Sequence, residues 1–118
     1  LGGIVAGHEL ARALDLRSIF AEKVDGKLVM RRFAIEPGAR YLIAEDVVTR
    51  GGRVQETIDL VREGGGKPVA VAVLVDRSAG QADFGMPLFS LLEMAPQVWE
   101  PTECPLCKAG QPFVHPGS

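Results

Sequence analysis

The stretch Tyr-Leu-Ile-Ala-Glu-Asp-Val-Val-Thr-Arg-Gly-Gly, residues 41–52, decides the fold. An apolar run leads to two adjacent carboxylates, Glu45 and Asp46, and two valines and a short polar loop with two glycines follow. After the loop, aliphatic residues recur at spacing i, i+4, i+7 from Val54, which is typical of a helix. The stretch therefore predicts a strand, an acidic pair, a glycine-containing turn and a helix.

The loop before this helix has the composition of a phosphate-binding site. The first N–H groups of a helix lack intrahelical partners, and the helix dipole is positive there. Gly51 and Gly52 allow left-handed backbone angles and a close approach of phosphate. A turn that binds nothing is the alternative. The acidic pair favours a ligand, because carboxylates at the end of a buried strand are costly to desolvate unless sugar hydroxyls or a hydrated metal ion satisfy them.

Residues 45–53, Glu-Asp-Val-Val-Thr-Arg-Gly-Gly-Arg, resemble the phosphoribosyl-pyrophosphate signature of the type I phosphoribosyltransferases. The resemblance extends from Leu1 to the C-terminal tail and is nearest to the orotate phosphoribosyltransferases. It implies an α/β fold with a central parallel sheet flanked by helices and a β-hairpin catalytic loop. It also implies transfer of the phosphoribosyl group from phosphoribosyl pyrophosphate to orotate, giving orotidine 5′-monophosphate and pyrophosphate in de novo pyrimidine (UMP) synthesis. Mg²⁺ is the implied cofactor and a homodimer the implied assembly.

Composition limits the classes of protein that this chain can represent. Its 118 residues, 47% of them hydrophobic, suit a single globular domain. A net charge of −2 gives no electrostatic case for nucleic acid or an anionic membrane. No apolar run is long enough to span a bilayer and no signal peptide is visible, so a soluble cytoplasmic protein is expected. Two cysteines are too few for a disulfide framework.

We expect a phosphoribosyltransferase core over residues 1–95 and an irregular tail over residues 96–118. The core is expected to be truncated at its N-terminus, because the chain begins with Leu1 rather than Met. The resembling family also carries a preceding helix, a hood over the base and a first strand, for which no sequence is present. One alternative is therefore that the chain is inactive by itself.

The N-terminal residues predict a helix over residues 4–14, after Gly2 and Gly3. The resemblance implies that this glycine pair holds the pyrophosphate of the donor, and a simple turn is the alternative. Residues 16–23 predict a strand that ends in charged residues. Asp-Gly at residues 25–26 predicts a hairpin turn.

The returning strand of this hairpin is expected over residues 28–33. Phe20-Ala21-Glu22-Lys23 resembles the entrance of the family's mobile catalytic loop, and Lys23 matches the family's lysine. Glu22 stands where arginine is usual, and the loop is shorter than in the family. Further cations of the hairpin either serve catalysis or form a solvated face: Lys27, Arg31 and Arg32.

Residues 68–75 form a continuous apolar run, which is typical of a parallel strand buried on both faces. Ligands of such sheets bind beyond the carboxyl ends of the strands, so Glu45, Asp46, Thr49 and Arg77 are expected on one rim. A guanidinium matches the carboxylate of orotate, and the resemblance implies this role for Arg77. A surface ion pair is the alternative role for this arginine.

The expected site follows from these assignments. Asp46 and Lys23 are expected to be catalytic, and Thr49 and Arg77 to bind orotate. Mg²⁺ is expected to bind through substrate and water, without a direct protein ligand. A purine-type transferase, in which Asp76 meets the base, and a nucleotide-binding regulator on the same fold are the alternatives. The residues expected to bind the donor are Gly2, Gly3, Lys23, Glu45, Asp46, Val47, Val48, Thr49, Arg50, Gly51, Gly52 and Arg53.

A last strand is expected over residues 88–94, followed by the tail with Cys104-Pro105-Leu106-Cys107. This Cys-x-x-Cys is half of a zinc site, with His115 as a possible third ligand. A redox pair is expected at a helix start after a strand, which the sequence does not predict here. Structural thiols are the remaining interpretation. A similar tail occurs in some bacterial orotate enzymes, which supports the resemblance without assigning chemistry.

Overall fold

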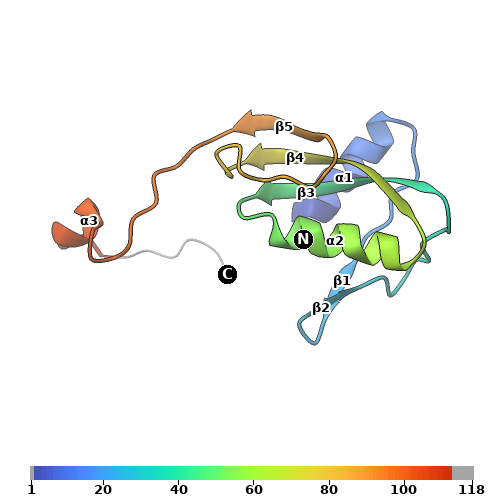
Figure 1. Ribbon diagram of the computed structural model, residues 1–118, viewed down its shortest axis with the longest axis horizontal. Coiled ribbons are helices and arrows are strands. Elements are labelled where there is room, and N and C mark those ends of the chain that lie inside the picture. Colours follow the sequence, from blue (N-terminus) through green and yellow to red (C-terminus); the bar gives the residue numbers. More distant parts are fainter. Residues whose placement is uncertain (1, 113–118) are drawn as a thin grey trace.

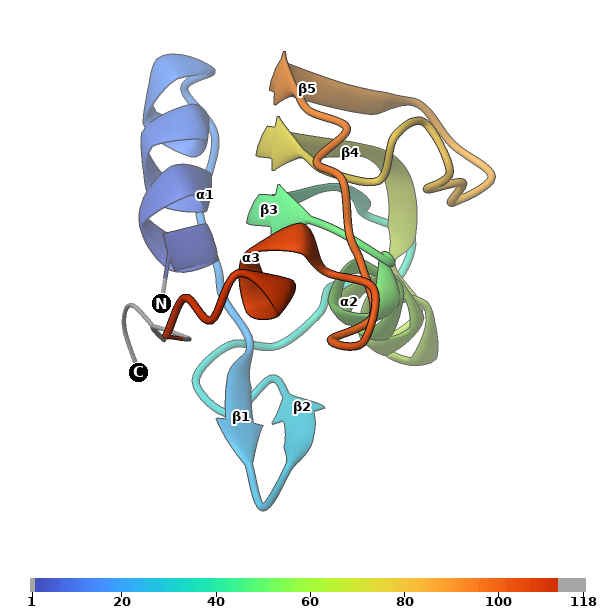
Figure 2. The ribbon, with the colours of Figure 1, turned by 90° about the vertical axis from the view of Figure 1, so that its left-hand side faces the viewer.

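A three-stranded parallel sheet is the centre of the protein, as a computed structural model that describes residues 2–112 shows (Figure 1). Its strands are β3 (Arg40–Val48), β4 (Lys67–Asp76) and β5 (Leu88–Glu93), in the spatial order β3-β4-β5. Helix α1 (Gly2–Ala13) lies on one face and α2 (Gly52–Glu63) on the other (Figure 2). The predicted α/β fold with a parallel sheet between helices is confirmed.

A small antiparallel hairpin projects from one side of these layers (Figure 2). It consists of β1 (Glu22–Val24) and β2 (Lys27–Val29), and the predicted Asp-Gly turn joins them. Asp25 (φ 48°) and Gly26 (φ 83°) are both left-handed, as a type I′ turn requires. Both strands are shorter than predicted. Residues 16–21 form no strand, because no partner strand lies beside them among the described residues.

The core lies between α2 and the sheet. Val54, Ile58 and Val61, the three positions of the helical pattern, are all buried on α2. They pack against buried side chains of the sheet, among them Val48 and Val71. Burying one such side chain contributes about 1.5–3 kcal/mol. The predicted helix and its buried face are confirmed.

The three glycines after α2 end the helix in a Schellman motif. Gly66 N–H donates to the carbonyl of Val61 (2.9 Å), and Gly65 N–H donates to that of Arg62 (2.9 Å). Gly65 is left-handed, with φ 81°. The chain then turns directly into β4, which fixes β3 and β4 side by side.

The prediction that β4 is buried on both faces was wrong. Leu74 on β4 is 45% exposed, and Phe89 and Leu91 on β5 are 61% and 84% exposed. Helix α1 packs on β3 and leaves this face of β4 and β5 uncovered by the described residues. An apolar run predicts a strand, but it does not indicate whether helices cover both faces of that strand.

Two element boundaries also differ from those predicted. Gly2 and Gly3 lie within the first turn of α1 rather than before it. The acidic pair lies within β3 rather than after it, because pairing with β4 continues through Val47↔Val75 and Val48↔Asp76.

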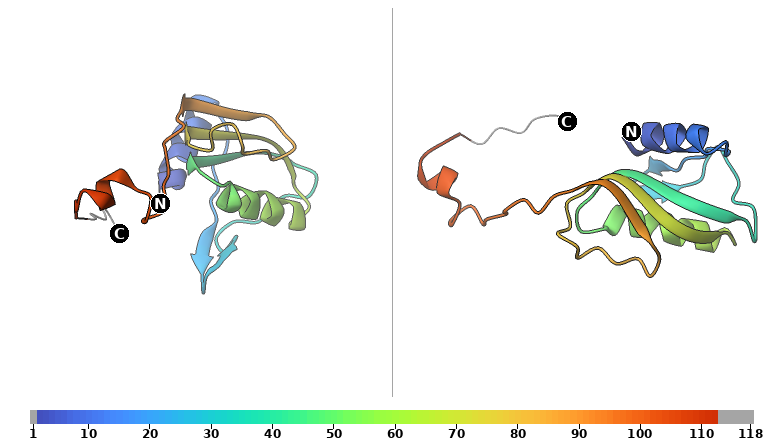
Figure 3. Two further views of the ribbon diagram at one scale, coloured as in Figure 1. Left: turned by 60° about the vertical axis from the view of Figure 1, so that its left-hand side comes forward. Right: turned by 90° about the horizontal axis from the view of Figure 1, so that it is seen from above.

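The tail leaves the sheet after β5 and extends away from it (Figure 3). It contains a short helix, α3 (Pro105–Lys108), in a region predicted to be irregular. The radius of gyration, 16.7 Å, exceeds the roughly 13 Å of a compact domain of 100 residues because of this extension. No helix within residues 2–112 is long and apolar enough to cross a membrane.

Candidate functional site

The loop between β3 and α2 exposes uncapped backbone N–H groups. Gly51 is the N-cap residue of α2 and is left-handed (φ 78°), and no side chain caps this helix. Its carbonyl accepts the first hydrogen bond of the helix from Gln55 N–H (2.9 Å). The N–H groups of the first turn are thus available for an anion, and the positive end of the helix dipole adds to the attraction.

The ring of Phe84 packs against this loop at Gly51. A Cβ added to Gly51 would lie 2.9 Å from Cε1 of Phe84, a separation that real Cβ atoms do not show. Phe84 is buried and belongs to the core, although it comes from the loop between β4 and β5. Sequence reasoning missed it. Its one signal is an aromatic residue in a loop that is otherwise rich in small and polar residues.

The acidic pair lies on β3, next to the loop of residues 49–51 that leads into α2. Glu45 Oε1 accepts a hydrogen bond from Asp46 N–H (2.9 Å), and Asp46 Oδ1 accepts one from Val47 N–H (2.8 Å). Burial raises the pKa of Glu45 above its ordinary value of 4.5, and the Asp46 carboxylate raises it further, while the N–H of Asp46 and the charge of Arg53 lower it. A hydroxyl donor or a cation at this pair would favour the ionised form.

The first turn of α1 lies directly against these carboxylates. A Cβ added to Gly2 would overlap Oδ2 of Asp46, and one added to Gly3 would overlap Oε1 of Glu45. Helix α1 reaches this position because both residues are glycine. The predicted pyrophosphate residues and the predicted ribose residues are therefore in contact.

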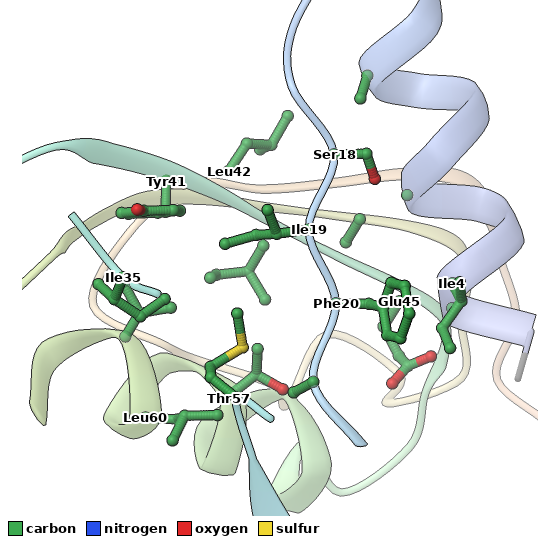
Figure 4. A pocket seen from close by; sticks show the side chains of 18 of the residues that line it. Ile4, Ser18, Ile19, Phe20, Ile35, Tyr41, Leu42, Glu45, Thr57 and Leu60 are labelled. Carbon is green, nitrogen blue, oxygen red and sulfur yellow. The ribbon is translucent and has the colours of Figure 1, made fainter. Parts of the chain in front are cut away.

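A cavity of about 710 Å³ opens beside the acidic pair (Figure 4). Its walls come from α1, the segment before β1, β3 and α2, and Glu45 and Phe20 lie at one end of it. Its volume is in the range of ligand pockets. Of the predicted site residues, it is lined by Gly3, Lys23, Glu45, Asp46 and Arg53.

Gly2 lies in α1 outside the cavity lining, and the remaining predicted residues lie in or beside the loop between β3 and α2. Arg77 N–H donates to the carbonyl of Val48 (2.8 Å), which places the arginine beside the loop between β3 and α2, and this residue is exposed. Val48 itself is buried in the core, with 1% exposure. None of these residues is among the described residues that line the cavity. Those outside the cavity lining are Val47, Val48, Thr49, Arg50, Gly51, Gly52 and Arg77.

Comparison with known proteins identifies the family and the fold of this chain. Residues 2–106 match the model of the phosphoribosyl transferase domain. The chain belongs to the phosphoribosyltransferase family. The expectation drawn from residues 45–53 is thereby confirmed at the level of the family.

Several curated relatives of this phosphoribosyltransferase chain are named orotate phosphoribosyltransferase. The proteins from Heliobacterium modesticaldum and Caldicellulosiruptor bescii are 50% and 52% identical over the whole of this chain, which covers 62% and 63% of them. That of Thermotoga maritima is 45% identical, and the chain covers 64% of it. The chain thus spans a little over three fifths of the length of these relatives.

A solved structure shares the fold. The adenine phosphoribosyltransferase of Rhodothermus marinus superposes with a TM-score of 0.61 over 80% of this chain and 65% of its own, at 26% identity. The type I phosphoribosyltransferase fold is therefore confirmed.

Asp76, the base-site residue of the purine alternative, holds the loop after β4 through its side chain. It is buried, and its Oδ1 accepts a hydrogen bond from Ser78 N–H (2.7 Å). The hydroxyl of Ser78 in turn accepts from Ala82 N–H (3.1 Å). The carboxylate of Asp76 thus shapes this loop, whereas Arg77 points away from the core.

The hairpin contributes one cation to the cavity among the described residues. Lys23 lines it and is exposed, whereas Lys27, Arg31 and Arg32 do not line it. Arg32 instead forms an ion pair with Glu22 (3.0 Å). Within residues 2–112, no group of three or more His, Cys, Asp or Glu side chains is arranged to hold a metal ion. His115, the possible zinc ligand, lies outside the described residues.

Proposed function

We propose that this chain is the donor-binding part of an orotate phosphoribosyltransferase. The observation that carries the proposal is the acidic pair beside an uncapped glycine loop, in a chain about half identical to proteins named for that activity. The reaction would transfer the phosphoribosyl group from phosphoribosyl pyrophosphate to N1 of orotate, releasing pyrophosphate.

The donor would lie across the acidic pair. Backbone N–H groups of residues 49–53 would take its 5′-phosphate, since the first turn of α2 has no side-chain cap. Glu45 and Asp46 would accept hydrogen bonds from the ribose hydroxyls, since both residues are only partly buried and line the cavity. Gly2 and Gly3 would border the pyrophosphate. Their contact with the carboxylates supports one continuous donor site.

Catalysis in this proposal consists mainly of positioning and charge. The ribosyl centre gains positive character as the pyrophosphate leaves, and the Asp46 carboxylate would stabilise it. Lys23 would add positive charge at the leaving pyrophosphate, because it comes from the hairpin and lines the same cavity. The hairpin would also exclude water when it closes.

Mg²⁺ fits this donor set only as an ion bound largely by substrate and water. The two carboxylates are adjacent, and burial disfavours the ionised form of Glu45, so a hydrated cation nearby would be stabilising. Glu45 and Asp46 are the residues that would orient its water ligands. The ion would supply positive charge to the pyrophosphate oxygens.

Orotate would bind at the rim through Arg77 and Thr49. Arg77 is exposed and held beside the phosphate loop by its backbone hydrogen bond to Val48. Its guanidinium can pair with the carboxylate of orotate through two hydrogen bonds. The likeness to an adenine phosphoribosyltransferase keeps a purine base as the second candidate. The buried, hydrogen-bonded state of Asp76 speaks against it.

We also propose a cytoplasmic homodimer. The support for a second copy is the uncovered apolar face of β4 and β5, which Phe89 and Leu91 expose. Light scattering of the purified chain tests this part, and a monomer at micromolar concentration would contradict it. Substitution Leu91→Glu is expected to lower the dimer fraction.

Titration calorimetry with phosphoribosyl pyrophosphate and Mg²⁺, then with orotidine 5′-monophosphate, tests the function. The chain is expected to bind both ligands. Asp46→Asn is expected to weaken donor binding by about 10- to 100-fold, since a hydrogen bond to a charged group is worth about 1.5–3 kcal/mol. Asp15→Asn, the same exchange at an exposed residue outside the site, is the matched control.

Arg77→Ala separates the two halves of the site in the same experiment. It is expected to weaken the binding of orotidine 5′-monophosphate more than the binding of the donor. Arg62→Ala on α2 is the control. Equal losses for both ligands would overturn the orotate assignment. Donor binding without orotidine 5′-monophosphate binding would retain the family and reject orotate as the base.

A further inference from the structure

The two cysteines of the tail are brought together by one turn of helix. Cys104 is the N-cap residue of α3, directly before Pro105, and Cys107 lies in that helix. The carbonyl of Cys104 accepts a hydrogen bond from Lys108 N–H (3.0 Å), which closes the turn. Cys104 has an extended backbone (φ −62°, ψ 121°) and Cys107 lies in the turn that follows, where the two thiols interact with each other.

The two thiols differ in character. The N–H of Cys107, its thiol and the N–H of Leu106 stabilise the thiolate of Cys104 and lower the pKa of Cys104, with the first as the largest cause. The same pairing raises the pKa of Cys107. One cysteine is thus favoured as a thiolate, and its neighbour is a thiol within reach.

Burial does not account for this pair. Both cysteines are free, Cys107 is exposed and Cys104 only partly covered, so neither is a core side chain. A redox pair was expected only at a helix start after a strand; Cys104 does stand at a helix start, but residues 94–104, which precede α3, contain no strand. Within residues 2–112 no third or fourth ligand completes a metal site with them.

We infer that Cys104 and Cys107 are a dithiol site that forms a reversible intrachain disulfide by exchange with small-molecule or protein disulfides. The Cys104 thiolate attacks one sulfur of the oxidant disulfide, breaks its S–S bond and expels a thiolate, which takes a proton from water. Cys107 then loses its proton, attacks the Cys104 sulfur and expels the second thiol. The two cysteine thiols are oxidised, and the oxidant disulfide is reduced to two thiols.

Mass spectrometry of the whole chain in buffers of reduced and oxidised glutathione tests this inference. The oxidised chain is expected to lose the mass of two hydrogen atoms and to contain no alkylatable thiol and no glutathione. Cys104→Ser and Cys107→Ser are expected to stop at the mixed disulfide, with one glutathione attached. Dithiothreitol is expected to restore both thiols of the unsubstituted chain.

The order of attack gives a second readout. Cys107→Ser, which leaves Cys104, is expected to react with iodoacetamide faster near neutral pH than Cys104→Ser, by about threefold for each tenfold rise in thiolate fraction. Two glutathiones on the unsubstituted chain, or disulfides between chains, would overturn the inference. Protection of both thiols by added Zn²⁺ at one ion per two chains, without intrachain oxidation, would overturn it in favour of a shared metal site.

Discussion

The two glycine pairs at the starts of α1 and α2 look alike in sequence, and the structure uses them differently. Gly51 is left-handed and lies on the ring of Phe84, while Gly52 has open space around it. Gly2 and Gly3 have helical geometry and lie against two carboxylates. Gly51 is required by the backbone and the core, whereas Gly2 and Gly3 leave room for the two carboxylates that they contact. A Gly-Gly before a helix therefore does not identify one kind of site.

Substitution of Gly51 is expected to have the largest effect. Gly51→Ala places a Cβ on the Phe84 ring and in a left-handed conformation, so the free energy of unfolding is expected to fall by about 2–4 kcal/mol. Urea unfolding measures this loss. Gly52→Ala is the matched control, since no atom lies within 4 Å of its Cβ, and the helix is expected to gain up to about 1 kcal/mol.

A second substitution identifies the cause of that loss. Phe84→Leu in the Gly51→Ala background is expected to recover part of the stability, with a coupling energy of about 0.5–3 kcal/mol. Additive effects of the two substitutions would show that Phe84 does not determine the need for glycine, and would leave only the left-handed backbone.

Gly3→Ala is expected to affect binding instead of stability. Its Cβ would displace the flexible end of Glu45, while the helix gains about 1 kcal/mol, so stability should change by less than about 1 kcal/mol. Donor affinity measured by calorimetry is expected to fall about tenfold, because the displaced carboxylate loses its hydrogen bond. Gly7→Ala on the same helix is the control, since its Cβ would meet only Ala44 at 3.4 Å. A stability loss as large as that of Gly51→Ala would remove the distinction between the two pairs.

The pH dependence of Glu45 is expected to give the smallest effect. Because its folded pKa is raised, the folded chain binds more protons than the unfolded chain between pH 4.5 and that pKa. Stability is therefore lost as pH rises through this window and is constant above it. Glu45→Gln is expected to remove this loss, so that its stability relative to the unsubstituted chain increases with pH.

Urea unfolding at several pH values measures the difference, and Glu103→Gln in the tail controls for one lost charge. A stability difference between Glu45→Gln and the unsubstituted chain that falls as pH rises would contradict the cause assigned here.

Much of the fold was predictable because its signals are local. The helical spacing from Val54, the Asp-Gly turn and the apolar run of β4 each depend on residues close in the chain. The acidic pair and the glycine loop before α2 were recognisable in the sequence for the same reason, and their roles in binding stay predictions. The start of α1 was predicted wrongly, because glycines usually end or precede helices, and here contact with carboxylates distant in sequence makes them suitable within one.

The remaining features depend on contacts between distant segments. Nothing near Phe84 in the sequence indicates that its ring lies under Gly51. The exposure of Leu91 depends on how far α1 extends over the sheet, which no pattern in β5 records. The cavity that joins Lys23 to Glu45 likewise forms only when the segment before β1 folds over β3.

The position of Phe84 also restricts how this domain can be re-engineered. The loop between β4 and β5 carries both Arg77, proposed to meet the base, and Phe84, whose ring packs against Gly51. A chimera that imports this loop from a relative with another base preference would exchange the support of Gly51 at the same time. A change of acceptor base by loop grafting therefore requires that Phe84 and Gly51 be kept, or exchanged together, as a matched pair.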